Sequence, residues 1–135
     1  MITIFDWFGY ETPYKERYQL IKKAGFDGVL LYWSDEFGNV DYKHNVELAR
    51  HEGLFVENIH TSFDNINDFW MDNLNGNEIT NYLLQCVDDC NKYEIPTMIV
   101  HITSGENPPK ANMLGIKRIR QITERAEQQG VNVAL

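Results

Sequence analysis

Short apolar runs alternate along the chain with longer runs in which apolar residues recur every three or four positions. An apolar run of about four to eight residues is typical of a buried parallel strand, and the longer periodic runs are typical of amphipathic helices. The pattern predicts strands over residues 2–8, 26–33, 54–61, 95–102 and 131–135, and helices over residues 12–24, 41–52, 78–93 and 113–129. Gly25, Gly53 and Gly130 each stand between a predicted helix and the next strand, where a glycine commonly ends a helix.

A strand followed by a helix, repeated four times and closed by a fifth strand, requires a parallel α/β sheet. Two architectures fit this (β/α)4-β order: an open flavodoxin-like sheet, and half of a TIM barrel, which needs about 250 residues when whole. The 135 residues are enough for one core and too few for two. We therefore predict a single domain over residues 1–135.

Two of the predicted strands end in a histidine, His60 in the third strand and His101 in the fourth. The chemistry of parallel α/β proteins lies at the carboxyl ends of the strands. One such histidine is more typical of a hydrogen-bonded core residue, but two at the same strand level favour a shared pocket. Alternation along the third strand predicts Asn58 on the side of His60 and Glu57 on the other side.

The connection over residues 62–77 is long for a βα loop, which usually takes about 2–6 residues, and it is rich in aromatic residues. It is either a surface loop that buries its own apolar groups or a partial lid with a helical turn near residues 67–71, in which Trp70 closes over a ligand. Trp33 ends the second strand, before a polar loop over residues 34–39, and is a candidate for stacking on a substrate.

The net charge of −8 argues against nucleic acid and anionic membranes as partners, because phosphate binding needs a basic surface. No basic leader precedes the first strand, and no apolar run approaches the roughly 18 residues of a membrane span. Cys86 and Cys90 lie on the apolar side of a predicted helix, which favours reduced, buried thiols over a disulfide or a zinc site. We expect a cytoplasmic protein that acts on small molecules.

Several motifs, in this order and spacing, resemble the xylose isomerase-like TIM barrels and, within them, the sugar phosphate isomerase/epimerase group. They are residues 14–18, 24–29, 52–54, 59–60, 99–101, 126–127 and 130–135. The resemblance covers the whole chain and implies the N-terminal half of a barrel. Leu30 and Leu31 depart from it, because many relatives carry an acidic residue on that strand.

The resemblance implies a sugar or sugar-phosphate isomerase or epimerase. In such enzymes a divalent metal (Mn, Mg, Co or Zn) chelates the substrate oxygens and stabilises an enediolate while carboxylates move the proton. In relatives, residues at the positions of His60 and His101 lie in the pocket, as metal ligands in the endonuclease-like branch and as substrate contacts in many epimerases, so both are assigned to the metal and to the substrate. Trp33 and Trp70 are added as substrate contacts because of their own positions, at a strand end and in the long connection. The resemblance places the catalytic carboxylates beyond Leu135, so no catalytic residue lies in this chain.

The 135-residue chain is therefore expected to be inactive by itself or to bind metal weakly. Two other functions stay open, an endonuclease IV-like metal-dependent phosphodiesterase and a non-enzymatic flavodoxin-like binding domain. Self-association of identical chains is expected to cover the open edges of the sheet.

Overall fold

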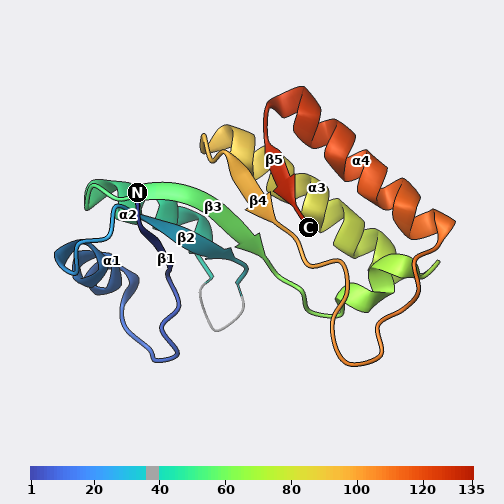
Figure 1. Ribbon diagram of the computed structural model, residues 1–135, viewed down its shortest axis with the longest axis horizontal. Coiled ribbons are helices and arrows are strands. Elements are labelled where there is room, and N and C mark those ends of the chain that lie inside the picture. The colour runs from blue at the N-terminus through green and yellow to red at the C-terminus, as the bar shows by residue number, and fades with distance from the viewer. Residues whose placement is uncertain (36–39) are drawn as a thin grey trace. The chain divides into compact units, whose positions relative to one another are not determined.

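The computed structural model describes residues 1–35 and 40–135 and shows strands alternating with helices along the chain (Figure 1). The strands are β1 Thr3–Phe5, β2 Gly28–Trp33, β3 Phe55–Thr61, β4 Thr97–Ile99 and β5 Asn132–Ala134. The α-helices are α1 Tyr14–Lys23, α2 Asn45–His51, α3 Leu74–Lys92 and α4 Met113–Gln129, and the 3-10 helices are η2 Tyr42–His44 and η3 Ile66–Trp70. The predicted alternation is confirmed, although residues 36–39 of the predicted loop lie outside the described residues.

The chain divides into two compact units, Met1–His60 and Thr61–Leu135. The prediction of a single domain over residues 1–135 stays a prediction. None of the helices in the described part of the chain is both long enough and apolar enough to cross a membrane.

In the first unit, the parallel strands follow one another in chain order, with β2 between β1 and β3. The register pairs Thr3 with Gly28 and Phe5 with Leu30. A flavodoxin-like sheet would place the first strand between the second and the third. The order found here therefore excludes the flavodoxin-like alternative.

The core of this unit lies on one face of β2, where alternate side chains are buried against α1 and α2. The fully buried residues include Tyr18, Val29, Leu31, Trp33 and Ala49. Gly28 is required at the start of β2, because a Cβ atom there would overlap the backbone carbonyl of Phe55 on β3.

In the second unit, β4 and β5 are parallel, with Met98 opposite Val133, and α3 and α4 lie side by side (Figure 1). Asn73 and Asn112 cap these helices, each accepting a hydrogen bond from a glycine N–H three residues ahead, Gly76 at 2.7 Å and Gly115 at 2.9 Å. The Asn73 cap explains why α3 begins at Leu74, four residues before the predicted start.

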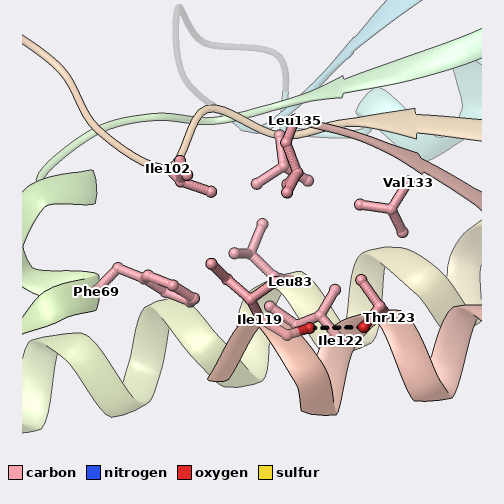
Figure 2. A pocket seen from close by; sticks show the side chains of 9 residues that line it. Phe69, Leu83, Ile102, Ile119, Ile122, Thr123, Val133 and Leu135 are labelled. Carbon is pink, nitrogen blue, oxygen red and sulfur yellow. Dashed lines mark hydrogen bonds between the residues drawn. The ribbon is translucent and has the colours of Figure 1, made fainter. Parts of the chain in front are cut away.

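A narrow apolar gap remains between the sheet and the two helices of this unit (Figure 2). Thr123 is the one polar residue that lines it, and its hydroxyl donates to the carbonyls of Ile119 and Arg120 within α4. The gap therefore offers no free polar group and is part of the core.

The start of α1 differs from the prediction. The helix predicted from residue 12 begins at Tyr14, the residue before it is Pro13, and no side chain caps it. The Thr12 carbonyl accepts a hydrogen bond from Nη2 of Arg17 at 3.1 Å. Arg17 thus ties the first turn of α1 to the segment that precedes the helix.

Candidate functional site

His60 is half-buried near the carboxyl end of β3, as predicted from the apolar run before it. Its ring lies 5.6 Å from the ring of Phe5 and 6.1 Å from that of Tyr32, measured between centroids. Phe5 is the last residue of β1, and Tyr32 is near the end of β2. The carboxyl ends of three neighbouring strands therefore bring one imidazole and two aromatic rings together, and the rings of Phe5 and Tyr32 also contact each other, with centroids 6.3 Å apart.

Glu57 lies on the same face of the sheet as His60. The Thr3 hydroxyl donates to its carboxylate, and Thr3 shares a face with Phe5, which contacts His60. The predicted opposite placement of Glu57 and His60 is wrong. Residues three positions apart on a regular strand point to opposite faces, so the in–out alternation is interrupted between Glu57 and His60, where Asn58 and Ile59 are both buried.

Trp33 lies on the other face of β2 from Tyr32, because successive residues of a strand point to opposite sides. Its side chain is fully buried and packs edge-on against Tyr42, with centroids 5.2 Å apart. The structure therefore does not bring Trp33 beside His60. Tyr32, one residue earlier, takes the place predicted for Trp33, whose contact with a substrate stays a prediction.

Asp6 follows β1 directly and is almost fully buried. Its carboxylate accepts hydrogen bonds from the Tyr18 hydroxyl at 3.0 Å and from the Tyr32 backbone N–H at 3.2 Å. Burial raises the pKa of Asp6 to about 6, against the opposing effect of these bonds and of the Arg17 charge. Asp6 therefore joins α1 to the same strand end that carries Tyr32.

His101 lies two residues after the end of β4 and is exposed. The residue between them, Val100, donates its N–H to the carbonyl of Ala134 on β5 at 2.9 Å. The ring of Phe63 meets the imidazole edge-on, with centroids 5.2 Å apart. His101 thus stands at the carboxyl end of its strand, as predicted, next to an aromatic residue of the long connection.

The predicted helical turn in that connection is confirmed as η3. Trp70, predicted to close over a ligand, is buried, and its indole N–H donates to the carbonyl of Ile102 at 2.6 Å. A Cβ atom on Gly115 would overlap the indole ring, so α4 lies directly against it. Whether Trp70 contacts a substrate stays a prediction.

The described residues do not form a complete site for the divalent metal that the resemblance implies. No group of three or more His, Cys, Asp or Glu side chains in residues 1–35 and 40–135 could hold a metal ion. A catalytic zinc ion, for comparison, typically takes three protein ligands. The assignment of His60 and His101 as metal ligands stays a prediction.

Comparisons with known proteins place the fold. No protein-family model and no curated protein matches the sequence. Among solved structures, D-psicose 3-epimerase with D-tagatose from Clostridium cellulolyticum matches 98% of this chain and 51% of its own, with a TM-score of 0.72 and 12% identity. An L-ribulose 3-epimerase matches 99% of this chain and 48% of its own, with a TM-score of 0.73 and 17% identity.

A further neighbour is a xylose isomerase-like TIM barrel protein from Mycobacterium smegmatis in complex with magnesium, with a TM-score of 0.66 and 12% identity. It matches 98% of this chain and 53% of its own. The chain thus spans about half the length of the structures it matches. The predicted fold class, five parallel strands and their helices forming half of a TIM barrel, is confirmed.

Proposed function

We propose that this chain provides part of the substrate pocket of a sugar or sugar-phosphate isomerase or epimerase. The supporting observation is that His60 and His101 each stand at the carboxyl end of a strand, in a fold whose solved neighbours include several sugar epimerases. That end of the strands carries the active sites of TIM-barrel enzymes. The reaction class is the transfer of a proton at a carbon next to a carbonyl group.

The surroundings of each histidine suit a sugar. Phe5 and Tyr32 beside His60, and Phe63 beside His101, offer apolar ring surface to the C–H groups of a sugar. The imidazoles can exchange hydrogen bonds with its hydroxyl groups. We also propose His60 and His101 as metal ligands, and Trp33 and Trp70 as further substrate contacts.

A titration with a ketohexose, followed by NMR, tests the proposal. The chain has four histidines, and His44 and His51 are exposed residues outside the strand ends, so they serve as internal controls. We expect D-psicose to shift the imidazole signals of His60 and His101 and to leave those of His44 and His51 in place. Equal shifts of all four signals, or no shift at all, would contradict the proposed site.

We further propose that the 135-residue chain does not turn substrate over by itself, because the described residues hold no complete metal-ligand set. Deuterium uptake from D2O at the carbon next to the sugar carbonyl measures this. Uptake at the rate of a working epimerase, with Mg²⁺ or Mn²⁺ added, would refute it.

The remaining proposals concern the surroundings of the protein. Cys86 and Cys90 are buried free thiols, which supports a reducing cytoplasmic location. The net charge of −8 supports a small-molecule substrate over nucleic acid, and it counts against the endonuclease IV-like alternative. We also propose that identical chains associate through open strand edges.

A further inference from the structure

We propose that η3 is a fixed support that positions His101, with Asn67 and Trp70 as its positioning residues. Three side chains from residues 63–70 contact three of the four residues in the segment 101–104. Phe63 packs against the His101 ring, Trp70 bonds to the carbonyl of Ile102, and Asn67 bonds to Ser104. Sequence reasoning interpreted this segment as a lid or a surface loop, and neither of these requires such bonds.

The bond between Asn67 and Ser104 is reciprocal. The Asn67 side chain donates from Nδ2 to the Ser104 carbonyl at 3.0 Å and accepts at Oδ1 from the Ser104 N–H at 2.9 Å. One amide thereby satisfies both backbone groups of a loop residue, as a neighbouring strand would. Together with the Trp70 bond, it fixes the backbone that follows His101 at two points.

Side chains of α4 and its N-cap in turn bind the backbone of η3. Arg118 on α4 donates from Nη1 to the carbonyls of Phe69 at 2.6 Å and Met71 at 2.9 Å. Asn112 donates from Nδ2 to the carbonyl of Trp70 at 2.7 Å. Because η3 is anchored to α4 in this way, its bonds to the loop transmit the position of a rigid element to His101.

The experiment compares Asn67→Ala, Asn67→Asp and Trp70→Phe with a control, Asn107→Ala, which alters an exposed asparagine in the loop after His101. NMR follows the imidazole signals of His101 and the hydrogen exchange of the Ser104 amide. Chemical denaturation of each variant gives its global stability.

In Asn67→Ala we expect the Ser104 amide to exchange about tenfold faster, the order expected for the loss of one hydrogen bond, and the His101 signals to shift. Asn67→Asp keeps the acceptor for the Ser104 N–H, so its Ser104 amide should stay protected. Trp70→Phe removes the indole N–H and should also shift His101. Asn107→Ala should change none of these signals.

If Asn67→Ala and Trp70→Phe only lower global stability, and the His101 signals and the exchange of the Ser104 amide stay unchanged, η3 contributes only to packing and the inference is wrong. The inference rests on the proposed function only in treating His101 as a residue of the site. Its readouts need no sugar, so a failure of D-psicose to bind would count against the proposed function and leave the positioning result standing.

Discussion

Asp6, Arg17 and Tyr18 form a buried polar cluster where β1 meets α1. Arg17 donates to the backbone carbonyls of Asp6 and Thr12, and the ring of Tyr14 lies 4.4 Å from its guanidinium carbon. The guanidinium does not bond the Asp6 carboxylate. Its attraction is therefore smaller than the cost of burying that charge, and the pKa of Asp6 is raised.

This cluster predicts a pH dependence of stability. Between pH 3.8 and about 6, the folded protein holds the Asp6 proton that the unfolded chain has already released. The free energy of unfolding should therefore fall by about 3 kcal/mol as pH rises through this window, because the pKa shift is about two units. It should stay at the lower value above the window. Chemical denaturation of the wild type and of Asp6→Asn at several pH values measures this. The difference between their free energies of unfolding should change within this window.

Asp88→Asn is the control, because it should act in the opposite direction. The hydrogen bond from Arg125 lowers the pKa of Asp88, so the stability that Asp88 contributes is lost as pH falls below 4. Parallel profiles for the wild type and Asp6→Asn between pH 4 and 7 would show that Asp6 does not titrate as expected.

At the scale of elements, the sequence was most informative where stability is local. The apolar stripe and the Asn112 cap of α4 are short-range features, and the predicted bounds of this helix match the structure. The contacts that hold η3 in place could not be read from the sequence, because Arg118, which lies 49 positions from Phe69, forms them with backbone carbonyls. Nothing in a local pattern marks that arginine as buried.

The same limit applies to the site. His60 and His101 could be found, because each follows an apolar strand. Their neighbours Tyr32 and Phe63 could not, because the choice between Tyr32 and Trp33 depends on which face of β2 meets the helices. The side predicted for Glu57 was wrong for a related reason, because the residue pattern does not indicate that the alternation is interrupted at Asn58 and Ile59.

Arg118 also predicts which arginine on α4 matters most for stability. Arg118→Met would leave the carbonyls of Phe69 and Met71 and the side chain of Asn77 without their donor. Because these are buried or part-buried bonds to a charged group, we expect a loss of about 3 kcal/mol in the free energy of unfolding.

Arg125→Met is the matched control. Arg125 forms a half-exposed pair with Asp88 at 2.7 Å, and such surface pairs contribute little to stability because water and salt screen them. Denaturant melts of the two variants compare the arginines directly. Similar losses in both would mean that Arg118 does not anchor η3.

At the scale of the whole molecule, the chain corresponds to about half of each solved structure that it matches. In a closed barrel every strand has two neighbours. Here β1 pairs with β2 and β5 pairs with β4, and neither has a second strand partner among the described residues. Apolar side chains next to these strands, Ile2 and Leu135, are exposed. Unpaired edges with apolar neighbours are the usual setting for association between chains.

Charge on an edge strand should therefore weaken self-association. Ala134 is an exposed residue of β5, and a lysine there should oppose pairing of this edge with another chain. We expect light scattering to show a mass above that of one chain for the wild type and a shift toward the monomer for Ala134→Lys. Ala111→Lys, which adds the same charge at an exposed loop position, should leave the mass unchanged.

A wild type that stays monomeric at high concentration, or equal effects of the two lysines, would mean that this edge does not carry the association. Because the readout is mass, the result stands apart from any test of sugar binding.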